Sequence, residues 1–286
     1  MPDTLGIIAG NGRFPFLVLD AARGRGDRVV IAAIREETDP VIARAAADAN
    51  AELHWLSLGE LSRLIDTFHR CGVSRAIMAG QVKHKQIFSS IRPDWKLAKV
   101  LLSLSTRNTD SLIGAVAKVL EDEGIHLMSS TELLTPLLAP SGVLTVRAPN
   151  ESELRDIAYG REIARAIAAY DIGQTVVIAA QACVAIEAME GTDAAIRRAG
   201  DIMRSLGADA GDGASTLSRA LTVVKIAKPK QDMRFDVPVV GVATIAAMHA
   251  AGATCLALDA GKCLLIDGTE RIIAAADDAS ISISAE

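Results

Sequence analysis

The chain has 286 residues, half of them apolar and very few aromatic, with a net charge of −5. That length suits one large or two medium domains, and the negative charge argues against general nucleic-acid binding, which needs a basic surface. No stretch is apolar and long enough to span a bilayer, no secretory leader opens the chain, and the four cysteines form no CxxC pair. We therefore expect a soluble cytoplasmic protein.

Strand and helix patterns alternate through the first 130 residues. Apolar strand-like runs lie at residues 5–10, 28–34, 51–58 and 75–80, and helical patterns lie at 14–26, 58–72, 94–104 and 109–123. Strands and helices in this rhythm predict right-handed crossovers and a Rossmann-like parallel sheet. Ligands of such sheets bind at the carboxyl ends of the strands.

A stretch rich in proline, residues 133–153, marks the expected boundary between two α/β domains. The predicted N-terminal Rossmann-like domain covers residues 1–138, and the predicted C-terminal catalytic domain covers residues 145–286. In the second domain we expect a helix over 151–171, two strands within 174–191 and a helix over 192–207. Strands should follow at 221–227, 237–243, 255–260 and 262–267, with Thr244 as the cap of a helix after the second of these.

Two glycine-containing loops fall at the predicted carboxyl edge of the first sheet. In "GIIAGNGRFP", Gly10 and Gly12 permit close backbone approach, and the next helix start offers N–H groups to a phosphate. In "MAGQVKHK", Gly80 and Gln81 precede two lysines. A dinucleotide fingerprint is incomplete because Pro15 holds the third position. Phosphate binding and a plain tight turn therefore both remain open.

Acidic and basic side chains gather in the second half of the chain. "IEAMEGTD" places carboxylates around a helix start, where they favour the helix dipole or hold Mg²⁺ with a substrate phosphate. The cations of "KIAKPKQDMRFD" follow later in the sequence. We expect this mixture to form a site for a charged phosphate ester with a cation; its members are Glu187, Glu190, Thr192, Asp193, Lys225, Lys228, Lys230 and Arg234.

Several stretches, in order and over nearly the whole chain, resemble one enzyme family. They are "LGIIAGNGRFP", "AGQV", "YDIGQTVVI…AIEAMEGTDAAIRR", "KIAKPKQDMRFDVPVVGVATI" and "LLID". Their pattern is similar to that of the magnesium-dependent UDP-2,3-diacylglucosamine pyrophosphatases of the lipid A pathway, which are unlike the calcineurin-type enzymes for the same step. The resemblance implies hydrolysis of UDP-2,3-diacylglucosamine to UMP and 2,3-diacylglucosamine 1-phosphate (lipid X), in a Gram-negative bacterium.

The resemblance also implies site residues and partners. Two α/β domains should hold the lipid product between them, and Asp236 should be the catalytic aspartate, as a general base or as a metal ligand. From the residues themselves, the expected Mg²⁺ ligands are Asp236, Glu190 and Asp193, in falling order, because hard oxygens are available and no His/Cys site for zinc is expected. The expected substrate contacts are Gly10, Asn11, Gly12, Arg13, Gly80, Gln81, Gln174, Gly191, Thr192, Lys225, Lys228, Gln231 and Arg234. Peripheral contact with the cytoplasmic face of the inner membrane and a homodimer are further expectations; no nucleic-acid partner is expected.

Two other classes of function remain open from the residues alone. A nucleotide-sugar or NAD-dependent oxidoreductase is disfavoured by the incomplete glycine fingerprint and by the absence of a Tyr-x-x-x-Lys pair. A non-catalytic nucleotide- or lipid-binding protein would bind the same substrate without releasing UMP.

Overall fold

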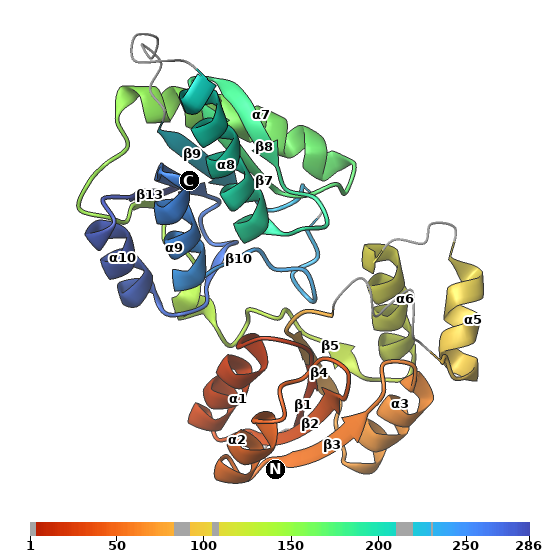
Figure 1. Cartoon of the computed structure of the whole chain (residues 1–286). Coiled ribbons are helices and arrows are strands. Elements are labelled where there is room, and N and C mark those ends of the chain that lie inside the picture. Colours follow the sequence, from red (N-terminus) through yellow and green to blue (C-terminus); the bar gives the residue numbers. More distant parts are fainter. Residues whose placement is uncertain (1–3, 83–91, 105–108, 210–219, 230) are drawn as a thin grey trace. The chain divides into compact units, whose positions relative to one another are not determined.

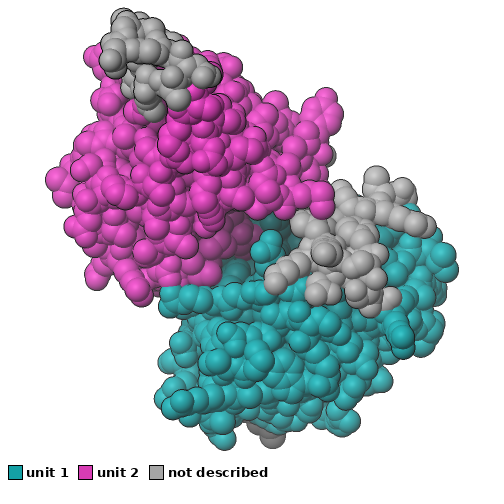
Figure 2. Space-filling model, viewed as in Figure 1, with its two compact units in different colours: residues 1–135, 232–236 teal, residues 136–231, 237–286 magenta. Residues whose placement is uncertain are grey.

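The structure is a computed structural model that describes residues 4–82, 92–104, 109–209, 220–229 and 231–286 (Figure 1). Lys83, Lys85 and Lys230, which the sequence placed near the site, lie outside the described residues. The chain divides into two compact units (Figure 2). Unit 1 is Met1–Thr135 with Asp232–Asp236, and unit 2 is Pro136–Gln231 with Val237–Glu286. Both units are α/β, as predicted.

Unit 1 is built on a parallel sheet of five strands in the order β3-β2-β1-β4-β5. That order matches the doubly wound sheets in which ligands bind at the carboxyl edge. The strands are β1 Thr4–Ala9, β2 Arg28–Ile34, β3 Glu52–Leu56, β4 Arg75–Ala79 and β5 His126–Leu127. The helices are α1 Phe14–Gly24, α2 Ile42–Asp48, α3 Leu61–Arg70, α5 Trp95–Ser103 and α6 Thr109–Asp122. The sequence pattern did not predict the short α2.

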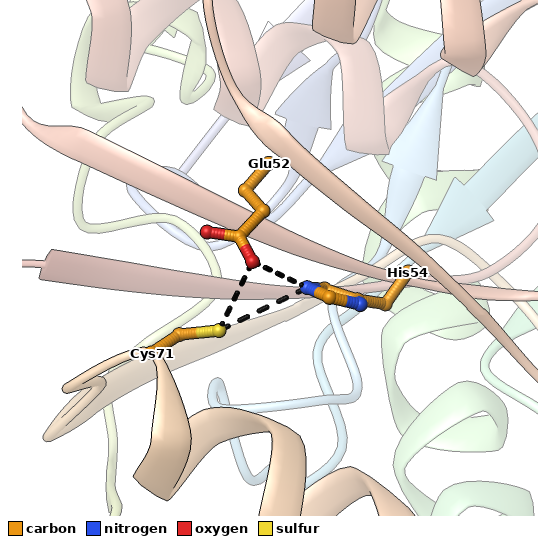
Figure 3. Close-up of side chains that lie close together, drawn as sticks. All are labelled: Glu52, His54 and Cys71. Carbon is orange, nitrogen blue, oxygen red and sulfur yellow. Dashed lines mark hydrogen bonds and ion pairs between the residues drawn. The ribbon is translucent and has the colours of Figure 1, made fainter.

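A buried apolar cluster joins the sheet of unit 1 to α3, α5 and α6. Phe68 of α3 is fully buried at its centre. Gly6 of β1 allows this packing, because a Cβ there would lie 2.8 Å from both the Phe68 ring and Val73. On the edge strand β3, the side chains of Glu52 and His54 point instead toward Cys71, which ends α3 (Figure 3).

The chain passes from unit 1 to unit 2 after Thr135, returns to unit 1 for Asp232–Asp236, and then leaves it again. The predicted division put every residue from 145 onward in the second domain, and this short segment departs from it. Its backbone is held by Ser130, and Phe235 packs against the apolar cluster of unit 1. Local contacts therefore place the segment that carries Asp236 on the N-terminal unit.

Unit 2 is built on a mixed sheet of six strands in the order β6-β13-β11-β9-β7-β8. The strands β9, β11 and β13 run parallel, and β6, β7 and β8 pair antiparallel with their neighbours. The strands are β6 Gly142–Val143, β7 Thr175–Ala179, β8 Ala182–Ile186, β9 Leu221–Lys225, β11 Ala253–Leu258 and β13 Ser282–Ala285. The remaining elements are a 3₁₀ turn Thr135–Leu137, α7 Glu151–Ala169, α8 Thr192–Asp209, β10 Val239–Val240, α9 Val242–Ala251, β12 Leu264–Leu265 and α10 Thr269–Asp278.

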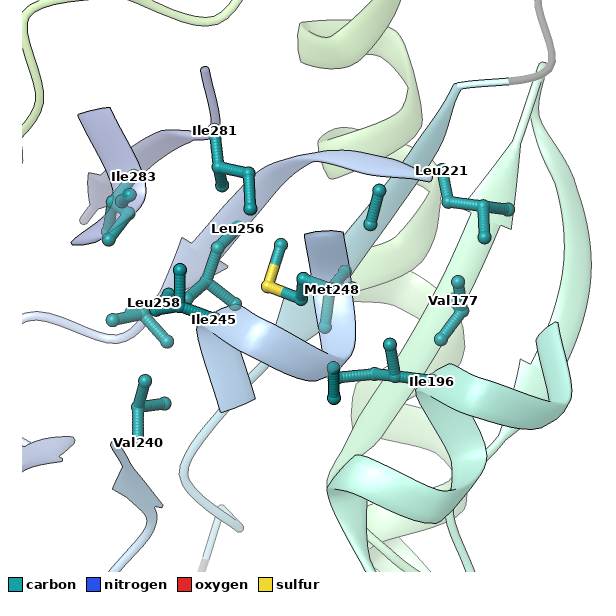
Figure 4. Close-up of a cluster of buried hydrophobic side chains, with 14 of the residues drawn as sticks. Val177, Ile196, Leu221, Val240, Ile245, Met248, Leu256, Leu258, Ile281 and Ile283 are labelled. Atoms are coloured by element: carbon teal, nitrogen blue, oxygen red, sulfur yellow. The ribbon is translucent and has the colours of Figure 1, made fainter. Parts of the chain in front are cut away.

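Apolar side chains fill unit 2 on both faces of this sheet. On one face, Val177, Leu221 and Leu256 pack with Ile196 of α8 and Met248 of α9 (Figure 4). On the other face, α7 packs against β7 and β9. A capping box between Asn150 and Glu153 fixes the start of α7. Helices α7, α8 and α9 thus pack on the sheet whose strand ends carry polar residues.

The predicted strand over 237–243 is too long, and the prediction of Thr244 as a helix cap is wrong. Only Val239–Val240 is a strand, and α9 already begins at Val242. The Asp267 carboxylate accepts a hydrogen bond from the Val242 N–H at 2.8 Å, so a residue distant in sequence supplies the helix cap. The Thr244 hydroxyl lies in the first turn and donates to Asp193 Oδ1 at 2.8 Å.

Candidate functional site

The two glycine loops of unit 1 are joined to each other through their backbones. The N–H of Asn11 donates to the carbonyl of Gln81 at 2.8 Å, and the N–H of Gln81 donates back at 3.1 Å. The N–H of Gly10 donates to Ala79 at 2.8 Å. The sequence correctly placed both loops at one sheet edge, but their amides serve mainly to bind one loop to the other.

Glycine is required at the positions in these loops for different structural reasons. A Cβ on Gly80, whose φ is +93°, would lie 2.5 Å from the carbonyl oxygen of Asn11, and one on Gly10 would lie 2.8 Å from that of Gln81. Gly12 also has a positive φ, +87°, yet its Cβ would meet nothing within 4 Å. Close loop packing therefore requires Gly10 and Gly80, whereas only backbone conformation requires Gly12.

The start of α1 offers fewer amide donors than the glycine pattern predicted. Pro15 has no N–H, and the N–H of Phe16 already donates to the carbonyl of Arg13. Within the described ranges, no side chain forms a capping hydrogen bond at the start of this helix. An anion at this end would therefore depend on the dipole and on few backbone donors.

Ser130, just beyond β5, anchors the segment that carries Asp236. Its Oγ lies 2.6 Å from the carbonyl oxygens of both Met78 and Arg234, between which its one proton is shared, and its N–H donates to Met233 at 2.7 Å. Asp236 is half-buried, and its N–H donates to the carbonyl of Asp232 at 2.9 Å. Ser130 thus ties the Asp236 segment to the carboxyl end of β4. The sequence analysis missed Ser130, whose only signal was a polar residue after a short strand.

Arg234 already has a carboxylate partner within unit 1. Its Nε and Nη2 donate to the two oxygens of Asp232 at 2.9 and 2.7 Å, and Glu121 lies 4.0 Å away. This hydrogen bonding lowers the pKa of Asp232 and raises that of Arg234. A phosphate that binds Arg234 would therefore compete with Asp232 for the guanidinium.

In unit 2, a buried lysine, a threonine and a glutamate form a hydrogen-bonded row. Lys225, at the end of β9, is 4% exposed, and its Nζ donates to Thr192 Oγ1 at 2.6 Å. The Thr192 hydroxyl donates to Glu187 Oε1 at 2.7 Å. Thr175, opposite Lys225 in the ladder, lies 3.4 Å from Thr192. The structure therefore brings together Thr192 and Lys225, which the sequence predicted as substrate contacts, at the start of α8.

Two acceptor atoms near this row are buried without a partner. Glu187 Oε2 and Gln174 Oε1 lack a hydrogen bond within the described part of the chain. Gln174 precedes β7, and its carbonyl accepts from the N–H of Ile226, the residue after Lys225. A buried unpaired acceptor is costly unless a ligand, ion or water satisfies it. Gln174 was a predicted substrate contact, whereas Glu187 was considered only as part of the acidic stretch.

The predicted metal carboxylates fall in both units. Asp236 belongs to unit 1, while Glu190 and Asp193 belong to unit 2. The Glu190 backbone amide and the Arg198 guanidinium, which is 2.6 Å from Oε1, lower the pKa of Glu190. Asp193 accepts from Thr244 through Oδ1. Within the described residues, the group that places three metal-binding atoms together is Glu52, His54 and Cys71, and it contains none of these carboxylates.

Three further predicted contacts lie in turns: Lys228 and Gln231 just before the Asp236 segment, and Gly191 just before α8. The Nζ atom of Lys228 is 2.5 Å from Asp171 Oδ1, and the backbone N–H of Lys228 donates to Gln231 Oε1 at 2.5 Å. The N–H of Gln231 returns to the carbonyl of Lys228 at 2.9 Å, which closes a turn. Gly191 has a φ of +83° just before α8. These residues shape the entry to the segment and to the helix start.

Comparison with known proteins identifies the family. The family described as "LpxI N-terminal domain" matches residues 4–137, and "LpxI C-terminal domain" matches residues 140–284. The chain belongs to the LpxI family. The UDP-2,3-diacylglucosamine pyrophosphatase LpxI of Caulobacter vibrioides (strain ATCC 19089 / CIP 103742 / CB 15) is 31% identical over 283 residues, which cover 98% of this chain and 96% of the relative. The predicted family resemblance is confirmed.

A solved structure shares little with this LpxI chain. The biotin carboxylase domain of the Hydrogenobacter thermophilus 2-oxoglutarate carboxylase, solved with MgADP, ADP and bicarbonate, is 13% identical. The match covers 73% of this chain and 41% of that chain, with a TM-score of 0.26. A score this low supports no argument about fold or ligands.

Helix α5 of unit 1 presents a mixed apolar and basic face. Trp95 is 68% exposed and Leu102 is 84% exposed, with the exposed Lys99 between them at helical spacing. Leu97 and Val100 cover the opposite, buried face. None of the helices in the described ranges has the length and hydropathy needed to cross a bilayer. The exposed face of α5 thus combines two large apolar side chains with a cation.

Proposed function

We propose that the residues described above carry out the pyrophosphatase reaction that LpxI family membership assigns to this chain. The protein hydrolyses UDP-2,3-diacylglucosamine to UMP and 2,3-diacylglucosamine 1-phosphate, a step of lipid A biosynthesis. The observation that carries this assignment is the match of both LpxI domains and of the Caulobacter enzyme over 98% of the chain. The substrate and bond are those named for that relative.

The chemical task is attack by water on a doubly negative pyrophosphate. The water oxygen forms a bond to phosphorus, the bond from phosphorus to the bridging oxygen breaks, and that oxygen leaves with the other phosphate. Negative charge repels the nucleophile and grows on the leaving oxygen, so positive groups lower the barrier. Lys225 can supply such charge in unit 2, because the low-dielectric surroundings of its buried ammonium group strengthen its attraction to a phosphate.

Asp236 acts on the attacking water in this proposal. Its carboxylate takes the proton that the water loses as the new bond to phosphorus forms. What supports this role is the anchoring of its segment by Ser130 at the carboxyl end of β4, where ligands of parallel sheets bind. A general base must be held in place, and this segment is fixed by hydrogen bonds from Ser130 to the carbonyls of Met233 and Arg234 and by the packing of Phe235.

Magnesium is the proposed cofactor. The candidate ligands Asp236, Glu190 and Asp193 offer hard oxygens, which suit Mg²⁺ and not a soft metal. Glu187 Oε2, buried beside Thr192 with no hydrogen-bond partner among the described residues, is a further oxygen that such an ion could satisfy. When bound, Mg²⁺ would offset charge on the pyrophosphate oxygens. The oxygen chemistry of these donors supports the choice of Mg²⁺, and a metal titration is the test.

Substrate binding is assigned to the unpaired acceptors and the loops. Gln174 Oε1 and Glu187 Oε2 accept hydrogen bonds, so they fit the hydroxyl or N–H groups of a nucleotide sugar and do not fit its phosphates. In unit 2, phosphate contacts fall instead to Lys225 and Thr192. In unit 1, Arg234 can contact a phosphate if Asp232 is displaced. The unpaired acceptors thus suit the hydroxyl and N–H groups of the substrate, whereas the cations suit its phosphates.

Membrane contact is assigned to the exposed face of α5. The acyl chains of the substrate are held in a membrane, and a face of Trp, Lys and Leu fits the boundary between headgroups and acyl chains. Co-sedimentation of the purified chain with vesicles containing anionic lipid tests this, with Trp95→Ser/Leu102→Ser as the variant. A cytoplasmic location and a homodimer stay predictions from the sequence, and light scattering checks the latter.

The assay for the function is release of UMP from UDP-2,3-diacylglucosamine by purified protein with Mg²⁺. Steady release that stops with chelator and returns with added Mg²⁺ supports hydrolysis and the metal together. Tight substrate binding without UMP would favour the non-catalytic alternative. Full activity in excess chelator would remove the metal from the mechanism while leaving the hydrolysis intact.

A further inference from the structure

Three side chains that bind metals in many proteins converge on unit 1, away from the proposed catalytic edge. Glu52 Oε1 lies 2.8 Å from His54 Nε2 and 3.3 Å from Cys71 Sγ, and His54 Nε2 lies 3.8 Å from that sulfur. Figure 3 shows these atoms pointing toward one another from β3 and from the end of α3. Among the described residues, these are the three potential metal-ligand atoms that lie within 4.8 Å of one another.

The local fold explains why these residues meet. Glu52 and His54 are two apart on a strand, so their side chains lie on the same face of the sheet. That face is covered by α3, whose C-terminal cap residue is Cys71. The edge position of β3 leaves one side of the cluster open: Glu52 and His54 are 44% and 27% exposed, whereas Cys71 is 8% exposed.

The distances fit a tetrahedral zinc site with small side-chain movements. With Zn–N and Zn–O bonds of about 2.05 Å and a Zn–S bond of about 2.3 Å, tetrahedral angles place N and O about 3.3 Å apart. The same geometry places the sulfur about 3.6 Å from each of them. The observed separations of 2.8, 3.3 and 3.8 Å differ from these by about 0.5 Å or less.

The donor set decides which cation suits the cluster. A thiolate, an imidazole and one carboxylate favour a borderline metal such as zinc(II) and disfavour Mg²⁺, which prefers oxygen ligands. Binding through the Cys71 thiolate would release the thiol proton to solvent. Arg28 lies 3.4 Å from Glu52 Oε2, the carboxylate oxygen that does not face the cluster, so the ligand oxygen stays available.

We propose that Glu52, His54 and Cys71 form a three-ligand site for zinc(II) or a cation of similar chemistry, with water as the fourth ligand. Such an ion would tie the edge strand β3 to the end of α3. The site lies at the amino end of β3, whereas Gly80 and Ser130 mark the carboxyl edge. The bound ion is therefore expected to stabilise unit 1, and this proposal does not depend on the pyrophosphatase proposal.

The experiment titrates Co²⁺ and Zn²⁺ into the full-length chain after reduction and removal of metals. Co²⁺ should give thiolate-to-metal absorption that saturates at one ion per chain, and Zn²⁺ should displace it. Loss of an outer contact weakens metal sites by about 10- to 100-fold, so removing a ligand in Cys71→Ser or His54→Ala should cost about 100-fold or more. Cys183→Ser is the matched control, since Cys183 lies in unit 2, and it should bind as the wild type does.

A second readout is thermal stability. Zn²⁺ should raise the melting temperature of the wild type and of Cys183→Ser, and should leave that of His54→Ala unchanged. The proposal is overturned if Co²⁺ gives no thiolate band, or if the band persists in Cys71→Ser. It is also overturned if Glu52→Gln and His54→Ala, measured in case Cys71→Ser fails to fold, bind as tightly as the wild type.

Discussion

Replacement of Gly80 by alanine should destabilise unit 1 far more than the same change at Gly12. Both glycines have a positive φ, +93° and +87°, and alanine in that region costs about 1–2 kcal/mol at either position. Only the Gly80 Cβ meets backbone atoms, at 2.5 Å from Asn11 O and 2.9 Å from Gly10 C. Backbone cannot move aside cheaply there, because each loop holds the other.

The difference can be worked from the hydrogen bonds that must break. Relief of the clash separates the Asn11 and Gln81 loops, whose two mutual backbone bonds are 2.8 and 3.1 Å long. At about 1 kcal/mol each, their loss adds about 2 kcal/mol. Gly80→Ala should therefore cost about 3–4 kcal/mol, and Gly12→Ala about 1–2 kcal/mol.

Urea unfolding of both variants, followed by circular dichroism, measures this difference. Gly80→Ala should also lower UMP release, because Gly80 follows the strand whose Met78 carbonyl binds Ser130 and thereby the Asp236 segment. Equal destabilisation by the two alanines would refute the reasoning. It would mean that the paired loops contribute nothing beyond the conformation of each glycine.

Three further predictions follow from the same contacts. Ser130→Ala should reduce UMP release about tenfold or more while costing only about 1 kcal/mol of stability, since it frees the Asp236 segment but leaves the core intact; wild-type turnover in this variant would contradict the anchoring role. Gln174→Leu should leave the melting temperature unchanged or raised, because an unpaired buried acceptor is removed, yet weaken substrate affinity about tenfold in a binding titration; a clear loss of stability would instead indicate a structural partner. Burial alone would raise the pKa of Glu153, but hydrogen bonds from Arg147, Thr254 and Asn150 hold this pKa below its ordinary value. The stability that the ionised carboxylate gives is present above its unfolded-state pKa and is lost as pH falls through its folded-state pKa. Glu153→Gln should therefore flatten the acid side of the curve of unfolding free energy against pH.

The sequence predicted the helices and strands that follow from apolar periodicity, and it missed the features that depend on contacts between residues distant in the sequence. The alternating patterns gave β1, β2, β4, α5 and α6 almost to the residue, because apolar periodicity is a local property. The start of α9 was missed because its cap, Asp267, lies far along the chain. No local pattern could indicate that cap.

The site divides in the same way. The motifs singled out Lys225, Thr192 and Gln174, which the structure gathers at the end of β9 and the start of β7. Pairing between charges was not visible: Arg234 is engaged by Asp232, and Glu190 by Arg198. Ser130 and the Glu52, His54 and Cys71 cluster were missed, since only the folded sheet brings their partners close.

The role of Asp236 is tested most directly by the rate of UMP release from UDP-2,3-diacylglucosamine in wild type and Asp236→Asn. Asparagine keeps the shape of the side chain but does not accept a proton from water. We expect a loss of about 10²- to 10⁴-fold in turnover, the range for a positioned general base, with melting temperature and substrate binding nearly unchanged. Recovery at high Mg²⁺ would assign Asp236 to the metal instead. A folded Asp236→Asn protein that releases UMP within a few-fold of the wild-type rate would contradict the account.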